Sequence, residues 1–542
     1  MPPDREAVIG AGHHCRWRER VTYLYVGRGR QSYPRPIHAE LHSPPSVSPA
    51  SSSAGPPPRV LAAAALLILA LHWVAYARFP SISSDEGGWP LAVREWLAGG
   101  GASRDYVMAP GYHWLLGVPM WIFGPYHWVT RPVSIVVSLI GLALFYRLSR
   151  RLADSNVAFW ATLLLGTSYS AVMVARRALI EPFQITLMIA LCLCVEHARR
   201  SRRRLAWEVA VTLVTALLLL TKSSAIFLLP ALVMAAGWPP TREWRSALRL
   251  SAALTIGASM AGAVFWRFYR VYPAAFAEGW GTDMRASNIT SASHWFSVGR
   301  FGLDPQAIEA TLAWGGLYEP FMLGLAFAAL CMAFVKREQI LMALWLVFGA
   351  VFQSIQFYVQ DNHRVVIVAP LCFLTAWVLS NVAQSTPRSP TTPRVLAWPS
   401  LLLAAMVAFG STRILLAMAS VRNADKPAVA WLSARTGPGD NVAAAPYVLM
   451  QLRAHPILYF KAFPGSSHVP TLERLTRVGA NWIVIDELEW QRKTLESPEA
   501  RALFDQALTD CCDLAWSAPE SPVEVYRVRS RAASSSSLPA RP

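Results

Sequence analysis

The chain has 542 residues, of which 54% are hydrophobic and only 15% are charged. Soluble domains carry about 25% charged residues, so this composition excludes an ordinary soluble protein and favours one that crosses a membrane several times. The 50 Lys and Arg residues outnumber the 33 Asp and Glu residues, and the net charge is +17. That excess either binds an acidic partner or orients the chain in a membrane.

Residues 1–59 are rich in Arg, Pro and Ser and end in SVSPASSSAGPPPR, which predicts a disordered N-terminal tail. A second disordered tail is expected at 531–542, where the chain reads RAASSSSLPARP. Neither segment is expected to contribute to the fold.

Eleven apolar runs follow the N-terminal tail, and most are long enough to cross roughly 30 Å of hydrocarbon as a helix. They cover residues 60–77, 132–147, 156–174, 179–196, 205–221, 223–237, 247–266, 317–335, 340–358, 365–383 and 395–418. The stretch Tyr112–Phe123 is too short to span and lies between Pro110 and Pro125. Its Trp114 and Trp121 favour an interfacial or re-entrant helix.

The distribution of basic residues orients these runs. If the N-terminus is cytoplasmic, the tail and the alternate loops hold 23 of the 50 Lys and Arg residues, most clearly in the loop Arg199–Arg204. The positive-inside rule then places the C-terminus on the exterior side. The charge therefore mainly sets topology, and no nucleic-acid partner is expected.

The polar parts of the chain lie outside the membrane in this topology, as loops 79–131 and 267–315 and a region at 420–530. The last region alternates helical and strand-like segments and predicts a small α/β domain. Helices are expected at Val429–Leu432 and Pro498–Leu508, and strands at Asn441–Ala445, Ile457–Phe460, Trp482–Asp486 and Val523–Val528. The predicted fold is thus an α-helical polytopic membrane domain at 60–419 with a C-terminal exterior α/β domain.

The first candidate site is the pair Asp85 and Glu86, a few residues beyond the first apolar run. Two adjacent carboxylates can act as a general base or bind a divalent cation. The alternative is that Ser84 or Asp85 only caps the helix that follows.

The second and third candidates lie at the exterior ends of later runs. Glu181 follows Arg176 and Arg177 in a tight turn, where it either faces a site or forms an Arg–Glu salt bridge that holds the turn. Lys222 separates two apolar runs beside Ser223 and Ser224. An ammonium beside hydroxyls suits a phosphate, although a lysine that marks the end of a span is commoner.

The fourth candidate is Gln360–Arg364. His363 and Arg364 could bind a phosphate or a sugar, and Asp361 could act as an acid. The alternative is that the segment is a polar loop that only caps a helix.

All four clusters fall on the exterior side. Acids, a lysine and arginines at one membrane face suit an enzyme whose substrate has a charged head and a lipid tail. Sequence motifs for nucleotide binding, serine hydrolases and zinc proteases are absent from the chain.

The order of these motifs resembles the GT-C fold of integral-membrane glycosyltransferases, in the branch of protein O-mannosyltransferases and lipid A aminoarabinose transferases (glycosyltransferase family 39). The resemblance covers roughly 60–385. Its elements are Ser84-Asp85-Glu86, Ala109–Trp114, Phe123-Gly124 with Arg131-Pro132, Arg177–Pro182, Thr221-Lys222 with Leu228–Pro230, and His363-Arg364 with Pro370. The chain departs from the family pattern at Ala109, Glu181 and Ser223-Ser224, where the family has Lys, Asp and Gly-Pro.

The resemblance implies inverting transfer of a sugar from a polyprenyl-phosphate donor to a lipid, glycan or protein acceptor at the exterior face. Asp85 would be the general base, with Glu86 or Glu181 assisting it. Arg177, Lys222, His363 and Arg364 would hold the phosphate. No cofactor is required by this reading, but Asp85 and Glu181 would be the ligands of a divalent cation if one is bound.

Two other classes remain open. A transporter of a lipid-linked or anionic substrate would place charged residues near mid-membrane and show an internal repeat, and no repeat is found. The other is a non-catalytic membrane scaffold. Composition and the missing signal peptide favour a bacterial inner membrane.

Overall fold

The computed structural model describes the chain from residue 55 to residue 529 with gaps. The described ranges are 55–76, 84–99, 104–201, 203–237, 244–275, 305–336, 339–355, 363–385, 398–420, 426–452, 455–458, 479–486, 498–519 and 523–529. The predicted tails at 1–59 and 531–542 therefore fall almost wholly outside the described residues, as does Asp361.

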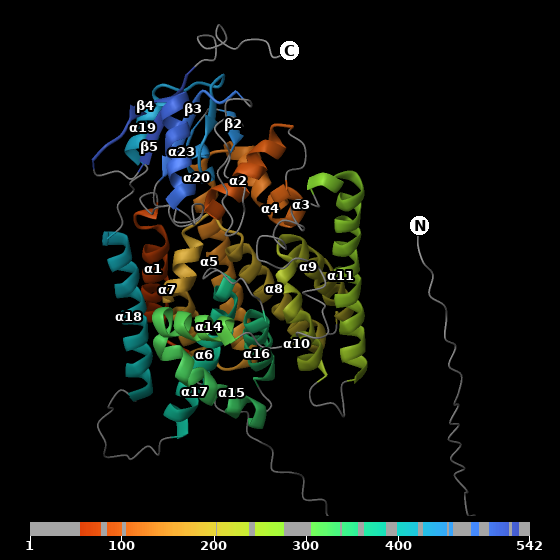
Figure 1. Ribbon diagram of the computed structural model, residues 1–542. Helices are drawn as coiled ribbons and strands as arrows, with labels where there is room; N and C mark the ends of the chain where they lie inside the picture. Colours follow the sequence, from red (N-terminus) through yellow and green to blue (C-terminus); the bar gives the residue numbers. More distant parts are fainter. Residues whose placement is uncertain are drawn as a thin grey trace, which may run out of the picture. The chain divides into compact units, whose positions relative to one another are not determined.

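Apolar helices make up most of the described chain (Figure 1). They are α1 (Pro58–Trp73), α5 (His127–Leu152), α6 (Ser155–Thr167), α7 (Tyr169–Ala175), α8 (Glu181–Arg200), α9 (Arg204–Thr221), η2 (Ser223–Phe227), α10 (Leu228–Ala236), α11 (Trp244–Val271), α15 (Pro320–Lys336), α16 (Ile340–Ile355), η3 (His363–Ile367), α17 (Val368–Ser385) and α18 (Trp398–Ser420). Four further helices are α2 (Ser84–Leu97), α3 (Arg104–Met108), α4 (Pro110–Phe123) and α14 (Pro305–Tyr318). Each of the eleven predicted runs coincides with one or two of the apolar helices.

Among the described residues, 6 helices are long and apolar enough to cross a membrane, or 7 if the bent pair α6 and α7 is one span. The apolar helices at Pro58–Trp73, Ser223–Ala236 and Ile340–Ser354 are shorter. These helices make the chain an integral membrane protein. The count of eleven spans stays a prediction, because an apolar run does not reveal where its helix is broken or shortened.

The two segments predicted as exterior loops contain helices. The segment 267–315 contains the end of α11 and most of α14, which were not predicted. The segment 79–131 contains α3, the start of α5 and the two helices that were expected there, α2 after the acidic pair and α4 at Tyr112–Phe123. The tail predicted to reach residue 59 ends earlier, because Pro58 starts α1, a position where proline's missing N–H is not needed. Hydropathy identified the apolar part of each helix and missed its polar ends.

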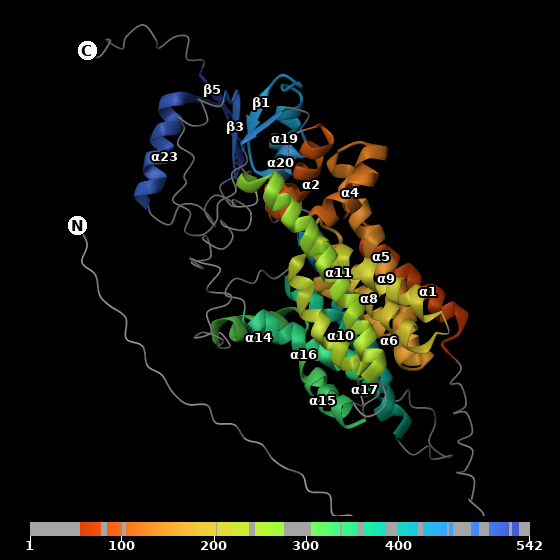
Figure 2. The same cartoon turned by 90° about the vertical axis from the view of Figure 1, so that its right-hand side faces the viewer.

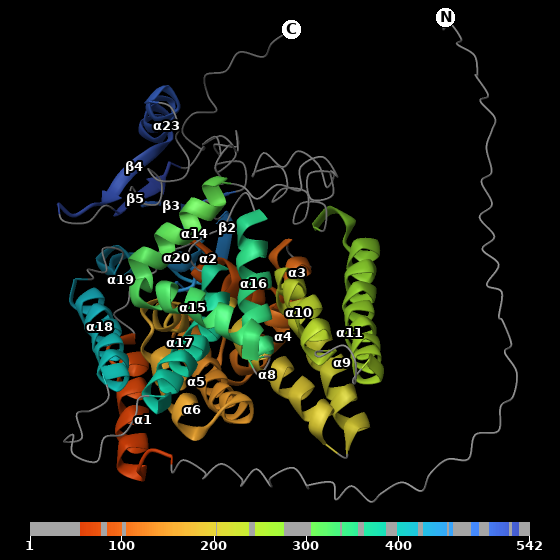
Figure 3. The same cartoon turned by 90° about the horizontal axis from the view of Figure 1, so that it is seen from below.

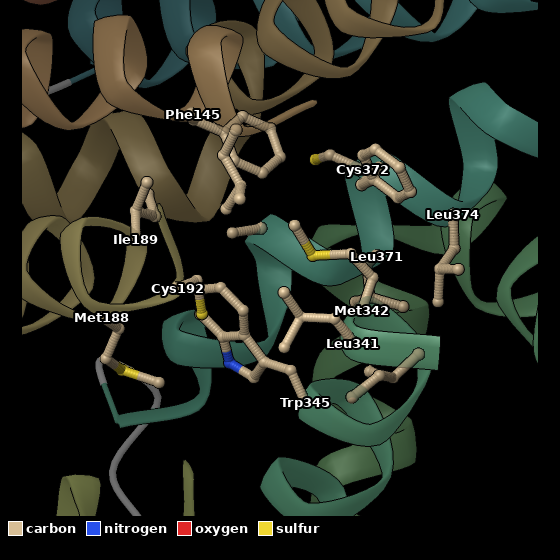
Figure 4. Close-up of a cluster of buried hydrophobic side chains, with 14 of the residues drawn as sticks. Phe145, Met188, Ile189, Cys192, Leu341, Met342, Trp345, Leu371, Cys372 and Leu374 are labelled. Atoms are coloured by element: carbon tan, nitrogen blue, oxygen red, sulfur yellow. The ribbon is translucent and has the colours of Figure 1, made fainter. Parts of the chain in front are cut away.

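The largest hydrophobic core lies where α5, α8, α16 and α17 meet. Trp345 of α16 and Phe373 of α17 are fully buried there, together with Phe145 of α5 and Met188 of α8. Figure 4 shows Phe145, Met188, Ile189 and Cys192 on one side and Leu341, Met342, Trp345 and Leu371 on the other, with their side chains directed toward one another. Helix α17 also packs along α6, as the view from below shows (Figure 3).

The short helix α4 was expected to be interfacial, and it packs against α2, α5 and α9. Tyr112 and Leu116 are fully buried, while Trp121 and Phe123 at its end are exposed. Gly111 lies directly against the backbone at the end of α9, where a Cβ on this glycine would come 2.8 Å from the Thr221 nitrogen. The close approach of α4 to α9 therefore depends on a residue without a side chain.

Replacing Gly111 with Ala is expected to lower stability by about 1–3 kcal/mol, because the added methyl group meets backbone atoms that cannot move aside alone. The measurement is the thermal denaturation midpoint in detergent. The matched control is Gly262→Ala in α11, where nothing lies within 4 Å of the new Cβ. Equal midpoints for the two variants would contradict the expected contact.

Residues 426–529 contain a mixed five-stranded sheet with strand order β2-β1-β3-β5-β4. Its strands are β1 (Asn441–Ala443), β2 (His455–Leu458), β3 (Trp482–Asp486), β4 (Cys512–Trp516) and β5 (Val523–Val528), and its helices are α19 (Lys426–Ser433), α20 (Pro446–Leu449) and α23 (Pro498–Cys511). Strands β1, β2 and β3 run parallel, and β5 is antiparallel to β3 and β4. The two predicted helices and three of the predicted strands are present. The fourth, predicted at Ile457–Phe460, overlaps β2 at residues 457–458, and its last two residues lie outside the described ones. Helix α20 and strand β4 were missed.

The sheet region is held to helix α2. Arg94, in the last turn of α2, donates to the carbonyl oxygens of Leu449 at 3.0 Å and Leu452 at 3.2 Å. Leu91 of α2 and Leu432 of α19 belong to one hydrophobic cluster. Figure 1 shows α2 beside α20 below the strands. The helix that carries the acidic pair is thus anchored to the C-terminal region.

Candidate functional site

Helix α2 brings Glu86 into a buried ion pair. The Nε of Arg131, from α5, donates to Oε1 of Glu86 at 2.5 Å, and both side chains are almost completely buried. Because two charges leave water together here, the pair is stable only while both partners are present. Asp85 lies one residue earlier in the first turn of α2, and its side chain is outside the described residues.

Two arginines hold the end of α1 next to this pair. Arg131 donates to the carbonyl oxygen of Tyr76 at 3.1 Å, and Arg176 donates to those of Leu71 at 2.7 Å and Val74 at 2.6 Å. Burial, followed by the nearby charge of Arg131, lowers the pKa of Arg176 to about 10, so this guanidinium remains charged at neutral pH. Leu71 lies in the last turn of α1, and Val74 and Tyr76 follow its end, where no helical N–H is left to bind these carbonyls.

The turn between α7 and α8 connects the surroundings of Glu86 to those of Glu181. The backbone N–H of Ala178 donates to Oε1 of Glu86 at 3.4 Å, and the hydroxyl of Tyr112 donates to the carbonyl oxygen of Ala178 at 3.2 Å. Burial and the charges of Glu181 and Glu86 raise the pKa of Tyr112 well above its usual value. Tyr112 therefore keeps its proton and remains a donor to the turn.

Glu181 is the first residue of α8, and its carboxylate meets two cationic or polar groups from other segments. Lys222 donates its ammonium to Oε1 of Glu181, and Nε2 of His363 lies 3.8 Å from the same oxygen. The N-terminus of α8 adds partial positive charge that favours the carboxylate. Three predicted residues that lie up to 182 positions apart in the sequence therefore meet at one point.

Local structure fixes the positions of Lys222 and His363. Lys222 stands between α9 and η2, where Nε2 of Gln184 reaches the hydroxyl of Ser224 at 3.4 Å. His363 opens η3, whose backbone is held by Gln353 through the His363 carbonyl at 3.2 Å. Trp345 binds the same turn through the carbonyl of Val366 at 3.1 Å.

The remaining predicted residues lie near this cluster in different ways. Arg364 is buried beside His363, and the charges of Arg364 and Lys222 both act on the His363 ring. Arg177 is half-buried in the turn before Glu181. Glu181 forms an ion pair with Lys222 from another segment, and the Arg–Glu salt bridge considered for this turn stays a prediction.

Binding of a divalent cation by Asp85 and Glu181 would have to compete with the contacts that Glu181 already makes. The ammonium of Lys222 already occupies Oε1, and a metal ion at the same oxygen would repel it. Among the described residues, no group of three or more His, Cys, Asp or Glu side chains is arranged to hold a metal. Binding of a divalent cation by Asp85 stays a prediction.

Sequence reasoning missed a further buried acid, Glu319, between α14 and α15. Its carboxylate accepts hydrogen bonds from the hydroxyls of Ser168 at 2.6 Å and Ser170 at 2.7 Å. These serines lie at the 60° bend between α6 and α7, so Glu319 caps the short helix that leads to Arg176. A single acid at the edge of an apolar run gives no sequence signal for this role. Arg131 and Tyr112 lie in motifs of the family resemblance, but their partners Glu86 and Ala178 were not predicted.

The arrangement of these helices has counterparts among solved structures. The structure of ArnT from Cupriavidus metallidurans in the apo state superposes with a TM-score of 0.59 at 16% identity, covering 86% of this chain and 97% of that one. ArnT bound to undecaprenyl phosphate gives a TM-score of 0.61 at 16% identity, covering 86% and 98%. The Archaeoglobus fulgidus oligosaccharyltransferase in the apo form gives 0.51 at 12% identity, covering 79% and 69%. The chain therefore has the GT-C fold.

Comparisons of the sequence find similarity to related enzymes over a shorter part of the chain. The family model described as dolichyl-phosphate-mannose-protein mannosyltransferase matches residues 107–266. The undecaprenyl phosphate-alpha-4-amino-4-deoxy-L-arabinose arabinosyl transferase of Pseudomonas aeruginosa (strain UCBPP-PA14) is 26% identical over 290 residues, covering 49% of this chain and 48% of that protein. The matched region thus spans about half the length of the curated relatives.

Proposed function

We propose that this protein is an integral-membrane glycosyltransferase that moves a sugar from a polyprenyl-phosphate donor to an acceptor at the exterior face of a bacterial inner membrane. The observation that carries the proposal is the convergence of Glu181, Lys222 and His363 at the ends of apolar helices. A phosphate attached to a lipid can reach such a point from the bilayer. The likeness in fold to a protein solved with undecaprenyl phosphate supports the same substrate class.

The donor phosphate binds among the basic groups at this point. Lys222 offers an ammonium with three donors, and Arg364 and His363 lie beside it. In the free protein Glu181 neutralises Lys222, and the phosphate replaces this carboxylate as the partner of the ammonium. Arg177 completes the set from the turn before Glu181, as the family resemblance implies.

The reaction is a single displacement at the anomeric carbon. The Asp85 carboxylate takes the proton of the acceptor hydroxyl, whose oxygen then forms a bond to this carbon. The bond between the anomeric carbon and the phosphate oxygen breaks, and its electron pair stays on the phosphate. Lys222 and Arg364 stabilise the negative charge that develops there. Attack from the side opposite the leaving group inverts the anomeric configuration.

Glu86 is assigned a positioning role within this proposal. Its Oε1 accepts hydrogen bonds from Arg131 and from the N–H of Ala178, so it joins α2 to α5 and to the turn before Glu181. Oε1 of Glu86 is thus already engaged by donors from two other segments of the chain. Asp85, next to Glu86 in α2, is the better candidate for the base.

The test of the proposed function is a transfer assay with the purified full chain. A radiolabelled sugar linked to undecaprenyl phosphate is incubated with membranes as the acceptor source, and labelled products are separated from the donor. Release of undecaprenyl phosphate together with a labelled acceptor is expected. Binding of donor without release, combined with its movement across sealed vesicles, would instead indicate a transporter.

Replacing Lys222 with Met is expected to weaken binding of undecaprenyl phosphate about 10–100-fold, because a hydrogen bond to a charged group contributes roughly 1.5–3 kcal/mol. Competition with the labelled donor measures this change. The matched control is Lys426→Met at the exposed start of α19, which should bind as the wild type does. Unchanged affinity in the Lys222 variant would remove this residue from the phosphate site.

A further inference from the structure

Several arginines lie at the far end of α8 from the candidate site. Helix α8 begins at Glu181 and is 20 residues long, so Arg200 at its end lies roughly 30 Å from the polar cluster. This distance matches the thickness of the hydrocarbon core of a bilayer. Arg200 therefore lies at the opposite face of the membrane. Helix α5 ends and α9 begins at this face, and Figure 2 shows α5, α8 and α9 side by side.

Two contacts hold the three helices together at this face. The Nη1 of Arg200 donates to the carbonyl oxygen of Arg151 at 2.9 Å, which joins the end of α8 to the end of α5. The ring of His197 in α8 stacks on that of Trp207 in α9, with the ring centroids 4.0 Å apart and the planes inclined by 16°. The basic side chains of the three helices are therefore gathered in one place.

The exposed arginines at these helix ends form one positively charged surface. This arginine patch consists of Arg150 of α5, Arg200 of α8, and Arg203 and Arg204 at the start of α9. The carboxylate of Glu196 lies 3.1 Å from both Arg199 and Arg200, so one acid is shared by two guanidiniums. Segments 147–157 and 196–208, which contain the patch, hold eight arginines and three acidic residues. This excess of positive charge suits an anionic partner.

An apolar stripe begins beside the arginine patch. Leu205, Val209 and Leu213 are exposed to 75%, 50% and 54%, and their spacing of four residues places them on one face of α9. Leu205 directly follows Arg204, so the stripe and the positive charge meet at the start of the helix. A soluble anion can use the arginines alone. A molecule that carries both a phosphate and a hydrocarbon chain can use the arginines and the stripe together.

We propose that the arginine patch binds an anionic phospholipid in the leaflet opposite to the candidate site. The phosphate accepts hydrogen bonds from Arg203 and Arg204, whose planar guanidiniums match two phosphate oxygens. One acyl chain lies along the stripe of Leu205, Val209 and Leu213. The ammonium of a zwitterionic head group is repelled by the same guanidiniums, so such a lipid binds less tightly. This site is separate from the proposed function, because it lies at the other end of α8.

The test measures lipid binding by the purified full chain in a neutral detergent. A phosphatidylglycerol with a fluorescent acyl chain is bound first, and unlabelled phosphatidylglycerol, phosphatidylcholine and glycerol 3-phosphate compete for its place. Phosphatidylglycerol is expected to compete at least about tenfold more strongly than phosphatidylcholine. Glycerol 3-phosphate should not compete, because it has no chain for the stripe.

Arg203→Gln combined with Arg204→Gln should weaken the binding of phosphatidylglycerol at least about tenfold and leave that of phosphatidylcholine unchanged. Arg150→Gln combined with Arg200→Gln removes charge from the other two helices and serves if the first variant does not fold. The matched control is Arg267→Gln combined with Arg270→Gln, which changes two exposed arginines in the last two turns of α11. It should keep the affinity and the preference of the wild type.

Three results would overturn the inference. The first is equal weakening by the control and the patch variants, or unchanged affinity in both patch variants, because binding would then not depend on the patch. The second is equal competition by phosphatidylcholine, which would remove the selection by charge. The third is equal competition by glycerol 3-phosphate, because the arginines would then hold a free phosphate rather than a lipid. Each of these results would leave the proposed function standing.

Discussion

Replacing Asp85 with Asn is expected to lower the rate of sugar transfer about 10²–10⁴-fold, the usual contribution of a general base. The amide is close to the carboxylate in size but cannot take the proton of the acceptor hydroxyl. Donor affinity should remain close to that of the wild type, because the proposed phosphate ligands are Arg177, Lys222 between α9 and η2, and His363 and Arg364 of η3. The measurement is the turnover number with a labelled undecaprenyl-phosphate sugar, alongside the dissociation constant of undecaprenyl phosphate.

The matched control is Asp513→Asn, a change of the same kind at an exposed aspartate of β4. It should leave both quantities unchanged. Transfer at the wild-type rate by the Asp85 variant would show that another group removes the proton. A parallel loss of donor binding would indicate that Asp85 serves the phosphate site or the fold rather than the proton transfer.

Replacing Arg131 with Met is expected to destabilise the protein by about 3–5 kcal/mol, because the carboxylate of Glu86 stays buried after its guanidinium is removed. The two side chains are exposed to only 3% and 0%, so water cannot replace the lost partner. The thermal denaturation midpoint in detergent measures the effect. Arg529→Met, which removes a partner from an exposed ion pair with Asp513, should change stability by no more than about 1 kcal/mol.

A double variant separates stability from function at this pair. Arg131→Met combined with Glu86→Leu removes both charges and should recover most of the lost stability, as the replacement of buried pairs by apolar residues often does. Transfer should remain low, since the bonds that fix α2 next to Ala178 are gone. Full recovery of transfer in the double variant would mean that the pair contributes stability alone.

The sequence was sufficient to predict the positions of most helices, because lipid requires long apolar runs and these are read directly from hydropathy. It also predicted Glu181, Lys222 and His363 as members of one site, since each lies at an end of an apolar run on the same predicted face. Strand β4 was missed because Cys512–Trp516 has no alternating pattern and lies at the edge of the sheet, where burial is incomplete.

The partners of these residues could not be predicted. Arg131 lies 45 positions after Glu86, and nothing in the local pattern around Arg131 distinguishes it from an arginine that marks the start of a span. The same holds for Glu319, whose serine partners lie about 150 positions away. Such pairings depend on how helices pack, which a pattern of apolar residues constrains only weakly.

The hydrogen bonds from Arg94 to Leu449 and Leu452 limit which segments of this protein can be exchanged with those of a relative. Helix α2 has the acidic pair in its first turn and the anchor of the C-terminal region in its last turn, so one helix belongs to both parts. A chimera that exchanges residues 426–529 alone would therefore place a foreign surface against Arg94 and Leu91. Modular exchange between relatives of this fold is expected to succeed when α2 and the sheet region move as one unit.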